Sequence, residues 1–225
     1  IETILSSMCD SVTQAETPET HAEAYARLVA AADCTFGEVL ICQKDSNQKT
    51  RDASNALLTL FVSHLAVEDS LMRLCSAVVA ETASMRSAAV LGLSMLCLKH
   101  RDDTRVTDTL PQLLETLCML LGEETAELSR AVLTFLKVCA AVLPMHMIQP
   151  LMPRMLSACT QELGSLKPKF AVRCRGIVRK LLTRAGEGAV RPHVPAEDLP
   201  LLEYLLRADR RKERKADENG KGRSK

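Results

Sequence analysis

The residues of this sequence best suited to binding chemistry are lysines and arginines that gather between positions 167 and 191. A helical wheel at about 100° per residue divides residues 169–185 into an apolar arc and a cationic arc. The apolar arc holds Phe170, Cys174, Ile177, Val178, Leu181, Leu182 and Ala185. The charges of the other arc are all positive, whereas a merely solvated helix face normally mixes both signs. Arginine and lysine in such an array suit phosphate oxygens, so the pattern predicts an anion-binding ridge. We therefore predict phosphate contacts from Lys167, Lys169, Arg173, Arg175, Arg179, Lys180, Arg184 and Arg191.

A second basic group follows in the tail from residue 207. Its sequence is typical of a nuclear-import signal or a nucleic-acid-binding arm, and a solubilising disordered extension explains it equally well. No aromatic residue interleaves with the ridge cations, so neither base stacking nor sequence readout is predicted there. The tail residues that we predict to contribute are Arg207, Arg210, Arg211, Lys212, Arg214 and Lys215.

The net charge of +1 hides a strong asymmetry along the 225 residues. Residues 1–164 hold 12 basic and 20 acidic side chains, a net charge of −8. Residues 165–225 hold 17 basic and 8 acidic side chains, a net charge of +9. This polarity indicates that the C-terminal end meets an anionic partner.

Catalytic and metal-binding patterns are weak throughout the sequence. The five histidines are scattered and form no HxxxH or HExxH pair. Gly186 and Gly188 follow a helical pattern, so they fit a helix C-terminus better than a phosphate cradle. The nine cysteines form no CxxC pair, and buried reduced thiols are favoured over a disulfide framework or a zinc site. We expect no enzyme, no cofactor, no metal and no small-molecule substrate.

Apolar residues recur at helical spacing almost everywhere, and no segment alternates for long with a period of two. We expect helices over the stripes at residues 57–65, 90–98, 113–121 and 132–142. Four segments begin with an arginine followed by small and aliphatic residues, and we expect each segment to be the second helix of a pair. These arginines are Arg51, Arg86, Arg130 and Arg175. They are 35, 44 and 45 residues apart along the sequence, close to the repeat length of ~40–47 residues in HEAT and armadillo arrays.

The spacing predicts an all-α fold, a HEAT/armadillo-type solenoid of stacked antiparallel helix pairs with a disordered or extended basic tail. We assign residues 1–206 to the solenoid and residues 207–225 to the tail. An irregular helical bundle is the alternative, and it is equally all-α. A tetratricopeptide array fits less well, because its period is ~34 residues. No apolar run approaches the ~20 residues of a membrane-spanning helix, so no membrane partner is expected.

Several blocks of the sequence resemble the ribosomal RNA-processing protein 12 family of HEAT-repeat ribosome-biogenesis factors. The most specific is KPKFAVRCRGIVRKLLTRAG from Lys167, followed by VPAEDLPLL from Val194 and the basic run from Arg207. MRSAAVLGL from Met85 and AVLTFLKVCAAVLP from Ala131 are similar to the same family, and the order of the blocks also agrees. One departure is Ala185 before Gly186, where the family tends to carry an aromatic residue.

The resemblance implies the C-terminal portion of a longer solenoid that acts as a non-catalytic scaffold. It also implies a nuclear and nucleolar location, with shuttling to the cytoplasm as an option. The implied task is to assemble or export the small-subunit precursor through pre-ribosomal RNA and small-subunit assembly proteins, with the nuclear transport machinery as an optional further partner. The alternative is a protein-binding adaptor, similar to a nuclear-transport receptor, whose basic ridge meets an acidic protein without direct RNA contact.

Overall fold

The computed structural model describes residues 2–123 and 125–221, and the side chains of residues 2, 123, 209 and 212–221 lie outside that description. The described residues form α-helices and short 3-10 turns and contain no strand, so the all-α prediction is confirmed for them. The chain divides into two compact units, Ile1–Val142 (unit 1) and Leu143–Lys225 (unit 2). This boundary differs from the predicted one after residue 206, and a single solenoid over residues 1–206 stays a prediction.

Unit 1 contains seven α-helices among its described residues, and four of them begin directly after a side chain that caps the helix. Thr17 forms a reciprocal capping box with Thr20. Asn47, Thr82 and Asp103 each accept a hydrogen bond from a backbone N–H in the first turn that follows. These side chains satisfy donors that a helix start leaves unpaired. The helices are α1 Glu2–Thr13, α2 Pro18–Cys42, α3 Gln48–His64, α4 Val67–Val78, α5 Ala83–Lys99, α6 Thr104–Met119 and α7 Ala126–Val142, with a 3-10 turn at Leu120–Glu123.

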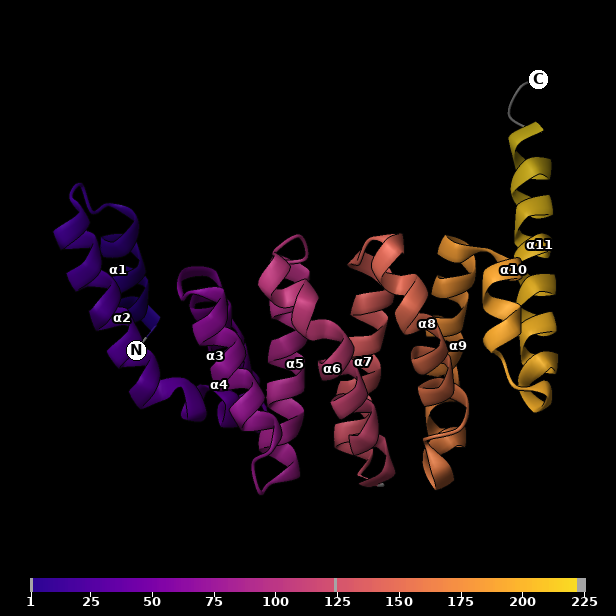
Figure 1. Ribbon diagram of the computed structural model, residues 1–225, viewed down its shortest axis with the longest axis horizontal. Coiled ribbons are helices and arrows are strands. Elements are labelled where there is room, and N and C mark those ends of the chain that lie inside the picture. Colours follow the sequence, from indigo (N-terminus) through magenta and orange to yellow (C-terminus); the bar gives the residue numbers. More distant parts are fainter. Residues whose placement is uncertain (1, 124, 222–225) are drawn as a thin grey trace. The chain divides into compact units, whose positions relative to one another are not determined.

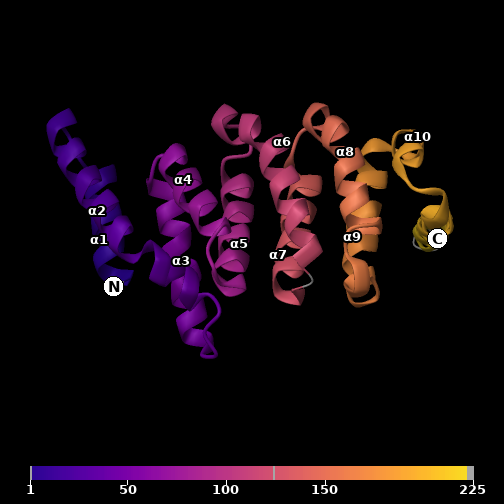
Figure 2. The same cartoon turned by 60° about the horizontal axis from the view of Figure 1, so that its bottom comes forward.

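The helices of unit 1 pack as successive pairs, α2 with α3, α4 with α5 and α6 with α7. The second helices of the pairs also contact one another, α3 with α5 and α5 with α7, and they lie side by side in Figures 1 and 2. Small residues allow this close approach, as the sequence predicts. A Cβ atom added to Gly92 would lie 2.5 Å from Leu74 Cδ2 and 3.5 Å from Leu58 Cδ2. Gly92 therefore sits where α3, α4 and α5 meet.

Polar contacts join α2 to α4, the first helices of two neighbouring pairs. The Tyr25 hydroxyl donates to Asp69 Oδ2 at 2.8 Å and accepts from the backbone N–H of Ala66 at 2.8 Å. Ala66 is the residue before α4 and has no side chain that can cap, so Tyr25 takes that role from another helix. Arg73 Nη2 donates to Asp33 Oδ1 at 2.5 Å, which joins the same two helices one to two turns further along.

Unit 2 packs its helices around α9. The helices are α8 Met145–Thr160, α9 Lys167–Ala185, α10 Glu187–Val190 and α11 Leu199–Lys221, with 3-10 turns at Gly164–Leu166, Arg191–His193 and Ala196–Asp198. α8, α10 and α11 all contact α9. Gly186 ends α9 with φ +83°, a conformation that glycine adopts without steric cost.

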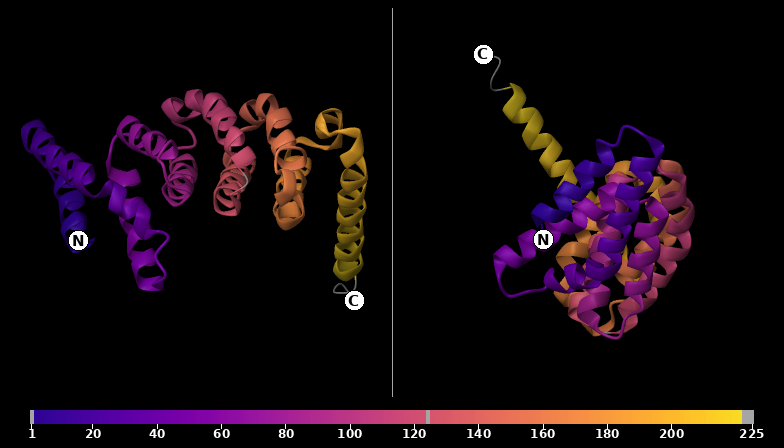
Figure 3. Two further views of the ribbon diagram at one scale, coloured as in Figure 1. Left: turned by 90° about the horizontal axis from the view of Figure 1, so that it is seen from below. Right: turned by 90° about the vertical axis from the view of Figure 1, so that its left-hand side faces the viewer.

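The basic tail is a helix in this structure, which corrects the prediction of a disordered or extended tail. α11 runs without a break to Lys221, and its C-terminal half projects past the rest of unit 2 (Figures 1 and 3). Residues 207–218 contain no glycine or proline and are rich in arginine, lysine, glutamate and alanine, all strong helix formers. Pro111, Pro150 and Pro153 lie inside α6 and α8 and not at helix ends.

Candidate nucleic-acid interface

α9 buries the apolar arc that the helical wheel predicts. Phe170, Cys174 and Ile177 are buried, as are Val178, Leu181 and Leu182, whereas Ala185 is half-buried. This packing fixes the rotation of α9 about its axis, because turning the helix would expose six buried side chains. The predicted cations are consequently directed away from the core of unit 2.

The exposed part of the cationic arc is a single row. Lys169, Arg173 and Lys180 are exposed, and on a helical wheel they fall within about 40° of one another. Arg184 continues the row at its C-terminal end but is half-buried, and its Nη2 donates to the backbone oxygen of Leu143 at 2.7 Å. The exposed cationic row of α9, Lys169, Arg173 and Lys180, is therefore the part of the predicted ridge best placed for an external anion.

Two further ridge cations on α9 lie apart from this row. Arg175 and Arg179 are half-buried on the opposite flank of the exposed face. Between the two flanks lie Val172, 72% exposed, and Gly176, at which an added Cβ would meet no atom within 4 Å. The ridge is therefore a cationic row, a neutral strip and a second, partly covered pair of arginines.

Two of the predicted phosphate contacts are engaged inside unit 2. Lys167 Nζ donates to both carboxylate oxygens of Asp198, at 3.2 and 3.3 Å, and so holds the start of α9 against the turn before α11. Arg191 lies in the 3-10 turn after α10 and bonds Glu187 at 2.9 Å as well as Glu203 of α11. These bonds lower the pKa of Glu203 and raise that of Arg191. Acids neutralise both cations locally, which makes each a weak candidate for phosphate binding.

The tail cations whose side chains are described lie on α11. Arg207, Arg210 and Arg211 are all exposed. The side chains of Lys212, Arg214 and Lys215 lie outside the described part of the structure, although their backbone is helical. Sequence reasoning missed the aromatic residue beside these arginines. Tyr204 is 60% exposed one turn before Arg207, and its spacing from Arg207 and Arg211 would have indicated a shared helix face.

Four of the buried cysteines form two hydrogen-bonded pairs, Cys97 with Cys139 and Cys159 with Cys174. A hydrogen bond to Cys97 raises the pKa of Cys139, and burial raises it further. In unit 2 a hydrogen bond from Cys159 lowers the pKa of Cys174. The described residues hold no cluster of three or more histidine, cysteine, aspartate or glutamate side chains arranged for a metal ion.

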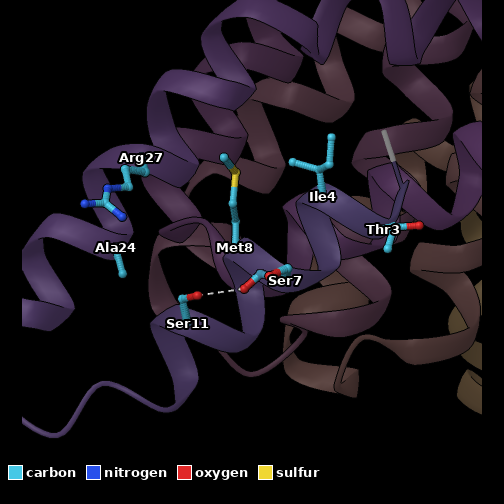
Figure 4. A pocket seen from close by; sticks show the side chains of 7 residues that line it. All are labelled: Thr3, Ile4, Ser7, Met8, Ser11, Ala24 and Arg27. Atoms are coloured by element: carbon cyan, nitrogen blue, oxygen red, sulfur yellow. Dashed lines mark hydrogen bonds between the residues drawn. The ribbon is translucent and has the colours of Figure 1, made fainter.

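Two surface hollows of unit 1 have no acid and base paired among the described residues that line them. Figure 4 shows the hollow between α1 and α2, of about 440 Å³, into which Ile4 and Met8 project from the same side of α1. Among the described side chains that line it, Arg27 is the one that carries a charge. A second hollow, of about 450 Å³, lies between α2 and α3 and is lined mainly by apolar atoms of Val39, Cys42 and Leu57. No helix within residues 2–123 and 125–221 is both long and apolar enough to cross a bilayer.

The geometry defines an all-helical protein whose distinguishing surface is a cationic helix face. Several curated proteins with related names are similar to this chain in sequence. No family model matches the chain. It is 21% identical over 208 residues to ribosomal RNA-processing protein 12 of Saccharomyces cerevisiae, covering 82% of this chain and 17% of that protein. It is 25% identical over 184 residues to the RRP12-like protein of Gallus gallus (77% of this chain, 14% of that protein). For the RRP12-like protein of Homo sapiens the identity is 23% over 185 residues (79% and 14%).

These proteins are homologues of the chain, so the resemblance predicted from the sequence is confirmed. The chain spans less than a fifth of the length of the curated relatives that it matches.

Proposed function

We propose that this chain is a HEAT-type solenoid segment of a ribosome-biogenesis factor, acting in the nucleus and nucleolus as a non-catalytic scaffold. In this proposal it helps to assemble or export the small-subunit precursor and contacts pre-ribosomal RNA and assembly proteins. The homologues are named for ribosomal RNA processing. The stacking of second helices, α3 on α5 and α5 on α7, is the neighbour-to-neighbour packing that a solenoid requires.

The single observation that supports RNA contact best is the exposed cationic row of α9. Its three charges stand on a helix whose rotation is fixed by a buried apolar arc, so they present a preorganised surface to an anion. Preorganised cations bind phosphate with less loss of side-chain freedom than a disordered tail would. The row carries no aromatic residue, so it would hold the RNA backbone and leave the bases unread.

A salt series tests this proposal. Binding of a structured RNA hairpin should weaken when Lys169, Arg173 and Lys180 are all replaced by glutamate. Each lost phosphate contact should reduce the slope of log affinity against log salt by about 0.9. The matched control replaces Lys49, Arg101 and Lys137, three exposed cations of unit 1, by glutamate and applies the same change of charge. Equal slopes for the two triple variants would contradict the assignment of the row to RNA.

The apolar hollow between α2 and α3 favours a second candidate function, a protein-binding adaptor. The hollow is partly open to solvent and its lining is mainly apolar. Such a site suits an apolar side chain of a partner protein better than it suits RNA. An Ala53→Arg variant would place a charge in this hollow. If the adaptor function holds, partner proteins that co-purify after nuclease treatment should be lost from this variant and retained by the triple variant of α9.

A further inference from the structure

The outward face of α11 carries one aromatic side chain among arginines. On a helical wheel Tyr204, Arg207 and Arg211 fall within about 60° of one another. The buried residues Leu202 and Leu205 lie on the opposite side of α11. Pro200, Glu203 and Ala208 complete a hollow of about 480 Å³ around these three side chains. The packing of unit 2 therefore turns the tyrosine and both arginines to the solvent together.

The two tyrosines of the chain have opposite surroundings. Tyr25 is half-buried, and its hydroxyl is held by Asp69 and by the backbone N–H of Ala66. Tyr204 is 60% exposed, and its hydroxyl has no hydrogen-bond partner within the part of the chain that the structure describes. The fold of unit 2 thus uses little of the apolar area of this ring, which leaves the ring face available to a ligand.

The described side chains around Tyr204 include more arginines than acids. Among them Glu203 is the acid that lines the hollow, and Arg191 bonds it from the turn after α10. That bond lowers the pKa of Glu203, so the carboxylate stays ionised and paired instead of opposing an anion. Arg207 and Arg211 are exposed at the same hollow, with Arg210 beside them. An exposed aromatic ring beside exposed arginines suits a ligand with both a flat ring and a phosphate.

We propose that this face of α11 binds single-stranded RNA, with an unpaired base stacked on Tyr204 and the adjoining phosphates held by Arg207 and Arg211. Stacking tolerates any base, because every base has a π-face, and arginine flanks add electrostatic attraction. This inference rests on the proposed function and extends it, since the α9 row would hold structured RNA by its backbone and α11 would hold an unpaired segment.

Tyrosine emission gives a direct test, because the chain has no tryptophan and two tyrosines. In a Tyr25→Phe background, whose helical content is first compared with that of the wild type by circular dichroism, Tyr204 is the sole emitting side chain. A single-stranded oligouridine of 12 nucleotides should quench this emission. An oligoglutamate of equal charge should leave the emission unchanged. Absence of quenching by bound oligouridine would overturn the stacking, and equal quenching by oligoglutamate would assign the face to an acidic protein.

Affinity measurements separate this inference from the proposed function. Tyr204→Ala should weaken oligouridine binding about 5- to 100-fold, keep the salt slope and leave hairpin binding unchanged, whereas Tyr204→Phe should retain full affinity. Arg207→Gln and Arg211→Gln should each reduce the slope for oligouridine by about 0.7. If Tyr204→Ala has no effect while the triple variant of α9 loses hairpin binding, this inference fails and the proposed function stands. If Tyr204→Ala weakens oligouridine binding while the triple variant of α9 keeps hairpin binding, only the assignment of the α9 row to RNA is refuted. If the wild-type chain binds neither RNA, the inference and the proposed function are both refuted.

Discussion

Arg105 Nη1 donates to both carboxylate oxygens of Glu68, at 2.8 and 2.7 Å, and so joins the first turn of α6 to the first turn of α4. The same guanidinium bonds Asp103, the residue that caps α6, with Nε at 2.9 Å and Nη2 at 2.6 Å. Arg105 therefore connects the N-terminal ends of α4 and α6, which are the first helices of two neighbouring pairs, and also holds the capping residue Asp103 in place. These bonds lower the pKa of Glu68 and lower that of Asp103 to about 2.

We predict that this arginine contributes stability that acid removes. Because the pKa of Asp103 is depressed in the folded chain, its contribution is present above the unfolded-state pKa of about 3.9 and is lost as the pH falls toward about 2. Arg105→Ala should lower the midpoint of thermal unfolding at pH 7, and the gap from the wild type should close between pH 4 and 2. Arg101→Ala is the control, because Arg101 bonds only its exposed neighbour Asp102 among the described residues. A gap that stays constant with pH would contradict the prediction.

The hydroxyl of Tyr25 should contribute more to the free energy of unfolding than the hydroxyl of Tyr204. Tyr25→Phe removes the bonds to Asp69 and to the backbone N–H of Ala66, and each net hydrogen bond contributes about 0.5–1.5 kcal/mol. We expect a loss of about 1–2 kcal/mol in the free energy of unfolding by urea. Tyr204→Phe removes the same atom from an exposed ring and should leave that free energy unchanged. Equal values for the two variants would show that Tyr25 does not cap α4.

Two helical glycines should respond to alanine in opposite directions. At Gly176 the added methyl group meets no atom within 4 Å, so Gly176→Ala should stabilise the protein by up to about 1 kcal/mol through helix propensity. At Gly92 the same methyl group would lie 2.5 Å from Leu74 Cδ2, and Leu74 is fully buried. Overpacking costs about 1–3 kcal/mol, which should outweigh the propensity gain. Urea unfolding of both variants measures the difference, and stabilisation by both would show that Leu74 moves aside freely.

Phe61 should be a critical core residue of unit 1. Its ring is fully buried and lies 5.6 Å, centroid to centroid, from that of Phe36 on α2. Phe61→Ala removes this contact and leaves a cavity, so we expect a loss of about 3–5 kcal/mol in the free energy of unfolding. Phe61→Leu retains most of the volume and should cost less. Hydrogen exchange resolved by residue would locate the loss, and a loss confined to residues 143–221 would contradict the assignment.

The sequence allowed the buried arc of α9 to be predicted because periodicity follows directly from which residues must leave water. Its apolar positions recur every three or four residues, and Phe170, Ile177 and Leu181 are buried as expected. The pairing of the cations could not be predicted in the same way. Lys167 meets Asp198 across 31 residues, a contact that depends on how α9 and α11 pack. Only the folded chain shows which cations are exposed and which are held by acids such as Asp198 and Glu203.

The arginine repeat was a good guide to the second helices but a poor guide to their starts. Arg51 and Arg86 are the fourth residues of α3 and α5, whereas Arg175 lies in the middle of α9. The early start of α9 follows from Lys167 and Pro168, since proline suits the first turn of a helix. Net charge does not distinguish a helical tail from a disordered one, whereas helix propensity does. Alternating arginine, lysine and glutamate without glycine or proline supports a helix even when no apolar face is buried.

The rate at which the buried thiols react with a reagent reports how often each unit opens. Cys97, Cys118 and Cys139 are closed off inside unit 1, Cys159 and Cys174 inside unit 2, while Cys34 is exposed. A brief pulse of an alkylating reagent would mark Cys34 at once and mark the others only during the moments in which their own unit opens. Mass spectrometry of the peptides would then give two separate opening rates from one unmodified chain, without the addition of any probe.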